Sequence, residues 1–151
     1  MLLMRSATEQ DFDAAIALLG ACKLPHEDLH PGGMGEFIVA MESRSLLGVI
    51  GLERFGKVGL LRSLAVSPER RSAGLGGELV DALERRSRDA GVEALYLLTT
   101  TAADFFARRG YAIVPRAQAP ASIQSTQEFS TLCPSQAVCL RKILTEQGGE
   151  P

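Results

Sequence analysis

The sequence predicts an α/β fold, a single domain in which helices flank a mixed central sheet of about seven strands. Three observations predict it. Strand-type and helix-type hydrophobic patterns alternate along the 151 residues. A continuously apolar run at 94–99 is typical of a strand buried on both faces. An apolar strand at 58–66 leads through a turn with two glycines into an amphipathic helix that ends near Gly91.

The remaining elements follow from local signals. A helix is expected after Thr8, whose hydroxyl can cap its first turn. A second helix spans 102–109 and stops at Gly110. The residues Phe55-Gly56-Lys57 signal a short hairpin. The expected strands are 2–6, 37–42, 46–54, 58–66, 94–99, 111–114 and 136–144, with a polar loop over 115–135 and a frayed tail over 146–151.

Composition excludes several function classes. The net charge is −2 with both signs mixed along the chain, so no nucleic-acid footprint is expected. The longest apolar runs are shorter than a membrane span, and Met1 to Arg5 is too brief for a signal peptide, which favours a cytoplasmic protein. Three cysteines without CxxC spacing argue against a disulfide framework and a structural zinc site.

The turn after the strand at 58–66 has the chemistry of an anion site. Glycines at 74 and 76 let several backbone N–H groups point at one spot, and the following helix adds its positive dipole end. A pyrophosphate fits such a site. A dinucleotide fingerprint would need glycine where Leu79 stands, and the Gly-Lys-Ser/Thr of a Walker loop is absent. The alternative is a surface turn that caps the helix.

The spacing Arg71-x-x-Gly74-x-Gly76 after Leu64-Ala65-Val66 resembles the acetyl-CoA loop of the GNAT superfamily of N-acetyltransferases. The resemblance implies a single GNAT domain over 1–145, acetyl-CoA as co-substrate and no metal. The residues that it assigns to the coenzyme are Leu64, Ala65, Val66, Arg71, Ser72, Ala73, Gly74, Leu75, Gly76, Thr99 and Phe106.

A second landmark of that family is Asn-x-x-Ala-x-x-x-Tyr-x-x-x-Gly-Phe after the fifth strand, and this chain has Thr99, Ala102, Phe106, Gly110 and Tyr111 there. The Thr99 hydroxyl can still bond the pantetheine amides. Phe106 cannot supply the proton that the family's tyrosine gives to the departing thiolate. A thiolate leaves readily near neutral pH, so the identity of the acid is open while the reaction class is not.

The general base is also atypical. Leu60 stands where many family members carry a glutamate. If Gly56 and Lys57 form a two-residue turn, Glu53 lies opposite Leu60 on the same face and can serve as the base. The alternative is a surface glutamate paired with Arg54 or Arg62. Both interpretations stay open, because a one-residue change of register reverses the face.

Arg62 is the candidate for acceptor binding. Regular alternation places it on the face of Leu60, Leu64 and Val66, with Ser63 on the opposite face under a helix. A cation in an apolar strand requires a partner. Either a substrate carboxylate or Glu53 can provide it.

A closer resemblance rests on Leu-Arg-Ser-Leu-Ala-Val at 61–66, on Gly51-Leu52-Glu53 and on Cys133-Pro134-Ser135. These segments look like the small N-acetyltransferases encoded beside arsenic-resistance genes, relatives of N-acetylglutamate synthase domains. The resemblance implies an amino-acid-like acceptor such as a glutamate analogue, with Ser135 on the substrate side.

Two further patterns have competing interpretations. His26-Glu27-Asp28-Leu29-His30 matches the HExxH zinc motif, but Pro25 and Pro31-Gly32-Gly33 leave room for little more than one turn. His26 or His30 is then either a base or gate on the acceptor side, or part of a solvated loop. The thiols of Cys22, Cys133 and Cys139 can chelate a soft ion, or Cys139 is strand core and Cys133 a loop thiol.

The sequence thus predicts an enzyme that transfers acetyl from acetyl-CoA directly to the amine of a small amino-acid-like molecule. A protein or peptide N-acetyltransferase and a non-catalytic acyl-CoA-binding domain are the alternatives. The expected partner is a small-molecule amine, without nucleic acid or membrane, and a homodimer stays open.

Overall fold

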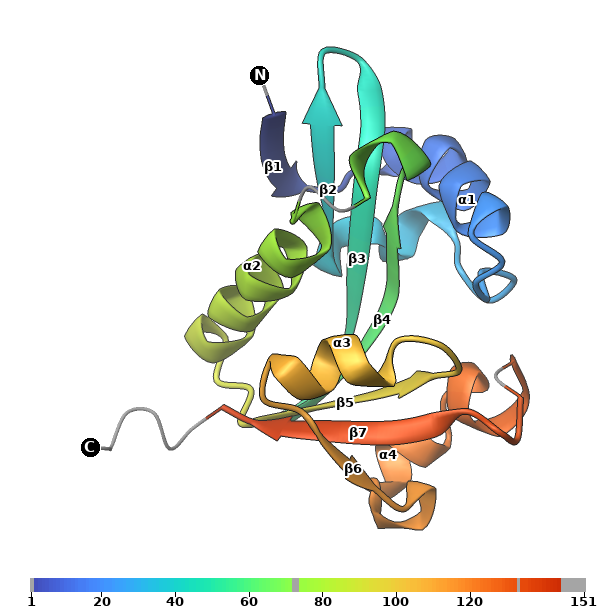
Figure 1. Cartoon of the computed structure of the whole chain (residues 1–151), viewed down its shortest axis with the longest axis vertical. Coiled ribbons are helices and arrows are strands. Elements are labelled where there is room, and N and C mark those ends of the chain that lie inside the picture. The colour runs from blue at the N-terminus through green and yellow to red at the C-terminus, as the bar shows by residue number, and fades with distance from the viewer. Residues whose placement is uncertain (1, 72–73, 133, 145–151) are drawn as a thin grey trace. The chain divides into compact units, whose positions relative to one another are not determined.

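The computed structural model describes residues 2–71, 74–132 and 134–144, and its seven strands are hydrogen-bonded in the order β1-β2-β3-β4-β5-β7-β6 (Figure 1). β4 and β5 are parallel, whereas β1–β2, β2–β3, β5–β7 and β6–β7 are antiparallel. The sheet is therefore mixed, which confirms the prediction. The strands are β1 (Leu2–Ser6), β2 (Phe37–Glu42), β3 (Ser45–Phe55), β4 (Val58–Val66), β5 (Ala94–Thr99), β6 (Ala112–Val114) and β7 (Val138–Ile143).

The helices are α1 (Phe12–Ala21), α2 (Leu75–Asp89), α3 (Ala103–Arg108) and α4 (Ala121–Gln124). Shorter helical segments are η1 (Glu9–Asp11), η2 (Pro31–Glu36), η3 (Pro68–Arg70), η4 (Arg116–Gln118) and η5 (Glu128–Leu132). Within the described residues, none of the helices is both long and apolar enough to cross a membrane. The chain divides into two compact units, residues 1–52 with 62–86 and residues 53–61 with 87–151.

Local signals explain where most elements begin and end. The strands expected at 2–6, 37–42, 58–66 and 94–99 have the expected bounds. Thr8 and Asp11 form a reciprocal capping box, in which the Gln10 amide donates to the Thr8 hydroxyl and the Thr8 amide donates to Asp11. Gly91 follows α2 in a left-handed conformation, with a φ of +88°.

The prediction of an irregular polar loop over 115–135 is wrong. The segment contains η4, α4 and η5. Its apolar residues are sparse but well placed, because Ala119, Ile123 and Phe129 are buried and pack on Leu60 and Tyr96 in the core of the second unit. These contacts stabilise short helical turns that the polar composition does not indicate.

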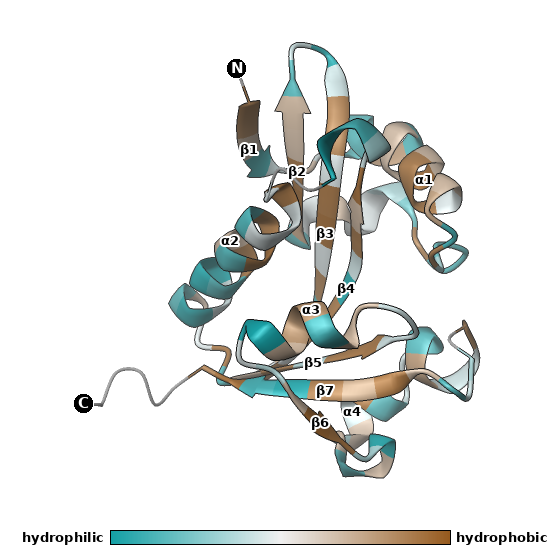
Figure 2. Ribbon diagram, in the orientation of Figure 1, coloured by the Kyte–Doolittle hydropathy of each residue, from teal (hydrophilic) through white to brown (hydrophobic). Residues whose placement is uncertain are grey.

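The first unit is packed closely around β3. A Cβ at Gly48 would lie 2.9 Å from Leu79 of α2, and a Cβ at Gly51 would lie 2.4 Å from the Phe37 ring. Only glycine allows these approaches. Figure 2 shows α2 with apolar residues along one side and polar residues along the other, and its apolar Leu75, Leu79 and Leu83 are buried. The start of α2, which follows the glycine turn, is therefore fixed against β3.

The second unit holds β5, β6 and β7, with α3 beside β7 (Figure 1). The parallel ladder joins Val58, Gly59 and Leu60 of β4 to Ala94, Leu95 and Tyr96 of β5. Cys139 is buried in this core, as the sequence predicts for a strand-core thiol, and burial raises the pKa of its thiol.

Candidate active site

The glycine turn leads directly into α2. Gly74 has a φ of +85°, a left-handed conformation that glycine adopts without strain, and a Cβ built there would meet no atom within 4 Å. α2 begins at the next residue, Leu75, and its first intrahelical bond runs from the Glu78 amide to the Gly74 carbonyl. Gly76 lies inside the first turn of the helix, so only Gly74 of the two glycines requires a glycine conformation. Space for a ligand and the positive end of a helix dipole meet at this turn.

The strand end that precedes the turn is held by side chains. The Arg71 guanidinium donates from Nε to the Val66 carbonyl at 3.1 Å and lies 3.2 Å from the Cys22 Sγ. The Cys22 thiol also approaches the Val66 carbonyl, at 3.9 Å. The Val66 carbonyl at the end of β4 is therefore already engaged by Arg71.

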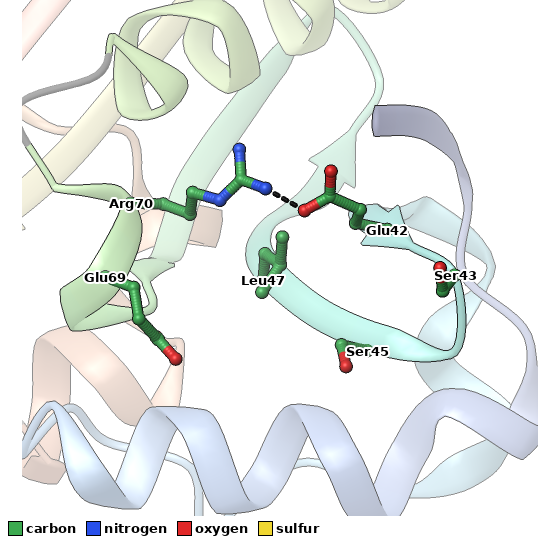
Figure 3. Close-up of a pocket in the computed structure, with 6 residues that line it drawn as sticks. All are labelled: Glu42, Ser43, Ser45, Leu47, Glu69 and Arg70. Atoms are coloured by element: carbon green, nitrogen blue, oxygen red, sulfur yellow. Dashed lines mark ion pairs between the residues drawn. The ribbon is translucent and has the colours of Figure 1, made fainter. Parts of the chain in front are cut away.

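A pocket of about 470 Å³ lies between η3 and the hairpin that joins β2 to β3 (Figure 3). Arg70 reaches across it and forms an ion pair with Glu42, while Glu69 points away from that pair (Figure 3). The pair connects η3, which precedes the glycine turn, to the hairpin. Ser72 and Ala73, which the sequence analysis assigns to the coenzyme, lie outside the described residues, as does Cys133.

β4 changes direction at Ser63, which has a φ of +63° although it is not glycine. Ala65 packs with α1 residues in the first unit's core, and Arg62 reaches the segment after α1. Residues 62 and 65 thus point to the same side, which regular alternation forbids. The prediction that Arg62 shares its face with Leu64 and Val66 is therefore wrong, because the left-handed residue between them reverses the alternation.

Arg62 forms a buried ion pair with Asp28. The guanidinium donates from Nη1 to Asp28 Oδ2 at 2.6 Å and from Nη2 to Asp28 Oδ1 at 2.9 Å. The Arg62 side chain is 0% exposed and that of Asp28 is 10% exposed. The Arg62 Nε donates to the Ser63 hydroxyl at 3.0 Å. The Ser63 side chain therefore does more than pack under a helix, which was the expectation from the sequence. Asp28, which was not among the partners expected from the sequence, thus supplies a carboxylate to the bidentate edge of Arg62.

This ion pair makes stability depend on pH. Burial alone would raise the pKa of Asp28, but hydrogen bonds and charge from Arg62 outweigh it and hold the pKa below its usual range. A carboxyl with a lowered folded-state pKa stabilises the protein above its unfolded pKa of about 3.9, and that stability is lost as the pH falls through the folded value. We expect Asp28→Asn to flatten this acid decline, measured by denaturant unfolding at a series of pH values. A variant with the wild-type decline would contradict the assignment.

Glu53 has the surroundings that the hairpin prediction requires. β3 ends at Phe55 and β4 begins at Val58, so the turn has two residues, and Gly56 has a φ of +65°. In such a turn Phe55 opposes Val58 and Glu53 opposes Leu60. Phe55, Val58 and Leu60 belong to one apolar cluster, as residues on one face should. Glu53 itself is only partly buried.

Thr99 and Phe106 are built into the second unit. The Thr99 hydroxyl accepts from the Ala102 amide at 2.9 Å, which supports the start of α3. Phe106 is buried and packs edge-to-face with Phe105 and Tyr111, with ring centroids 5.0 and 5.3 Å apart. Its ring is therefore part of the packing of this aromatic group.

The two histidines lie in a turn. Residues 26–30 form a single turn, closed by the Leu29 amide bonding the His26 carbonyl, so the HExxH spacing does not lie on a helix. Within the described part of the chain, no three His, Cys, Asp or Glu side chains are grouped to hold a metal ion. His26 is partly buried near Gly20, and Ser135 is exposed in the turn before β7.

Curated relatives match parts of the chain. An amino-acid acetyltransferase of Pseudomonas paraeruginosa is 38% identical over 73 residues, which are 48% of this chain and 17% of that protein. An amino-acid acetyltransferase of Pseudomonas putida is 45% identical over 56 residues, which are 37% of this chain and 13% of that protein. The chain therefore matches less than a fifth of the length of these relatives.

Solved structures share the fold at low identity. N-acetylglutamate synthase from Neisseria gonorrhoeae, complexed with coenzyme A and N-acetyl-glutamate, has a TM-score of 0.84 at 22% identity, over 95% of this chain and 35% of that one. Rv2747 from Mycobacterium tuberculosis, in complex with CoA and NLQ, has a TM-score of 0.80 at 23% identity, over 94% of this chain and 99% of that one.

The family model of the acetyltransferase (GNAT) family matches residues 4–111. The match begins within β1 and includes β2 to β5, the glycine turn, α2 and α3. It ends at Tyr111, the last residue of the second sequence landmark. The chain belongs to the GNAT acetyltransferase family.

Proposed function

We propose that the chain binds acetyl-CoA at the glycine turn and along β4 and transfers the acetyl group directly to the amine of an amino-acid-like molecule. The observation that carries the proposal is the left-handed Gly74, with open space beside it, at the start of α2 in a chain of this family. The names of the Pseudomonas relatives and the ligands of the Neisseria enzyme support the amino-acid class of acceptor.

The residues present fit the coenzyme's pyrophosphate. Backbone N–H groups at the start of α2 suit phosphate oxygens, and the exposed Arg71 is a positively charged residue of the segment that leads to this helix. Acetyl-CoA supplies an activated thioester. β4 holds the pantetheine arm through backbone groups of Leu64 and Val66, and backbone N–H groups of this strand polarise the thioester carbonyl.

Glu53 is the proposed general base. An α-amine is mostly protonated near neutral pH, so a carboxylate must take one proton, directly or through a water, before the nitrogen attacks. The new C–N bond then forms as the C–S bond breaks. The nitrogen releases its second proton to water as the amide forms. The coenzyme thiolate departs with the sulfur electron pair and takes a proton from water, since Phe106 has none to give.

We expect Glu53→Gln to lower kcat at least tenfold at pH 7, within the range of about 10² to 10⁴ that general bases contribute. Part of the rate should return at high pH, where the free amine is abundant. Steady-state kinetics across pH measures both effects, with acetyl-CoA affinity as the control that should not change. A variant with the wild-type rate at every pH would remove Glu53 as the base and leave His26, His30 or a water chain.

A panel of acceptors tests the substrate class. Because Asp28 occupies the bidentate edge of Arg62, His26 and Ser135 are the residues proposed to recognise an acceptor carboxylate. We expect L-glutamate and its analogues to be acetylated faster than peptides with free N-termini. The reverse order would favour a protein N-acetyltransferase, and binding of acetyl-CoA without turnover of any amine would favour a non-catalytic acyl-CoA-binding domain.

A further inference from the structure

Ser63 holds a backbone conformation that needs an external support. A non-glycine residue at a φ of +63° is uncommon and persists where its surroundings enforce it. Ser63 is 6% exposed, and its hydroxyl accepts from Arg62 Nε at 3.0 Å. That bond ties the side chain of Ser63 to a guanidinium that cannot easily move.

Arg62 is fixed in turn by the segment after α1. Asp28 binds it bidentately, and the Pro25 carbonyl lies 3.5 Å from its Nη2. A guanidinium is planar, so holding one edge with Asp28 sets the direction in which Nε points at Ser63. With the Arg62 side chain 0% exposed, water does not compete for these bonds.

We propose that Asp28 and Arg62 are positioning residues for acetyl transfer. Together with the Ser63 hydroxyl they form a relay that keeps Ser63 left-handed and thereby orients the backbone of Leu64 to Val66. The proposal rests on the proposed function, in which that backbone holds the thioester. The relay also connects this backbone to the segment that carries His26. The coenzyme side and the proposed acceptor side of the site are thus held by the same ion pair.

The relay assigns Arg62 a role that differs from substrate binding. If Asp28 merely occupied a site meant for an acceptor carboxylate, its removal would open that site and lower the acceptor KM. If Asp28 positions the backbone, removing Asp28 reduces kcat and does not lower the acceptor KM. The two accounts therefore predict effects on different kinetic constants.

Two substitutions at Ser63 isolate the hydroxyl from the backbone conformation. Ser63→Ala and Ser63→Gly both remove the bond from Arg62, but only glycine adopts a positive φ without strain. We expect Ser63→Ala to lower kcat about tenfold or more, because small displacements of reacting groups are costly, and Ser63→Gly to stay within about threefold of the wild type. Affinity for acetyl-CoA, measured by calorimetry, should fall in Ser63→Ala, because the displaced backbone of Leu64 to Val66 also holds the pantetheine arm, and should stay near the wild-type value in Ser63→Gly.

Asp28→Asn completes the kinetic test, with Asp28→Glu as the conservative variant that restores the charge. We expect Asp28→Asn to lower kcat without lowering the acceptor KM, and Asp28→Glu to recover part of the loss. A lower acceptor KM in Asp28→Asn, or equal rates in Ser63→Ala and Ser63→Gly, would overturn the relay.

A structural readout separates this proposal from the proposed function. Backbone amide resonances of residues 62–66 should shift in Ser63→Ala and in Asp28→Asn and stay near the wild-type positions in Ser63→Gly. If the wild type turns over no amine, the proposed function fails while these resonances still decide the relay. Unchanged resonances in Asp28→Asn would contradict it.

Discussion

Replacing Gly74 by valine should reduce acetyl-CoA affinity by at least two orders of magnitude while the protein stays folded. The φ of +85° at this position suits glycine, and a β-branched residue there is a strong outlier. The variant therefore shifts the backbone N–H groups that precede α2, and a misdirected set of donors loses the bonds to the pyrophosphate. Because a Cβ at Gly74 meets nothing within 4 Å, the loss comes from the backbone and not from a clash.

Gly91→Val is the matched control for this experiment. Gly91 has a φ of +88° and equally open surroundings, but it follows the other end of α2. Its substitution imposes the same kind of backbone strain beyond the opposite end of the 15-residue helix α2. Calorimetry should show wild-type affinity in Gly91→Val. Equal losses in the two variants would mean that general destabilisation, not the turn, explains the effect.

Arg62→Leu should destabilise the protein by about 3–5 kcal/mol, the usual cost of leaving one member of a buried ion pair without its partner. That is a large fraction of the total stability of about 5–15 kcal/mol expected for a protein of this kind. The reason is the Asp28 carboxylate, which is 10% exposed and would lose both of its bonds to the guanidinium. Chemical denaturation measures the loss.

The double variant Arg62→Leu with Asp28→Leu tests the cause. Removing both charges leaves no buried unpaired carboxylate, so most of the lost stability should return. Under the relay, kcat should stay low in the double variant, because neither leucine can hold the Ser63 hydroxyl. A double variant as unstable as Arg62→Leu alone would show that Arg62 acts through contacts other than Asp28.

The strands and the glycine turn could be predicted from the sequence because their signals are local. Alternation, the Gly56-Lys57 turn and the glycine before α2 each depend on neighbouring residues, and the structure places these elements within about one or two residues of the expectation. The helical segments over 115–135 could not be predicted in the same way. Their burial depends on contacts of Ile123 and Phe129 with distant strands.

The candidate site was predictable where glycine marks it and unpredictable where long-range pairing decides it. The left-handed conformation of Gly74 is one that glycine commonly adopts, so the residue type indicates it. Ser63 takes a left-handed conformation that no residue preference indicates. Because of this one residue, the side chains of β4 after Ser63 point to the opposite faces from those expected by regular alternation. The partner of Arg62 lies 34 residues earlier in the chain, in a segment whose sequence resembles a zinc motif. The burial of Arg62 and its pairing with Asp28 could be recognised only from the three-dimensional structure.

The proposed activity of this chain is acetyl transfer from acetyl-CoA to an amino acid. The most direct measurement follows the loss of thioester absorbance after wild-type protein and acetyl-CoA are mixed with L-glutamate or a glutamate analogue, with N-acetylated product identified by mass spectrometry. Reading the thioester avoids thiol reagents, which could also react with the partly exposed Cys22. We expect turnover that requires the amine and disappears in Gly74→Val. Thioester loss at the same rate without an amine, or tight acetyl-CoA binding with no N-acetylated product from any amine offered, would contradict it.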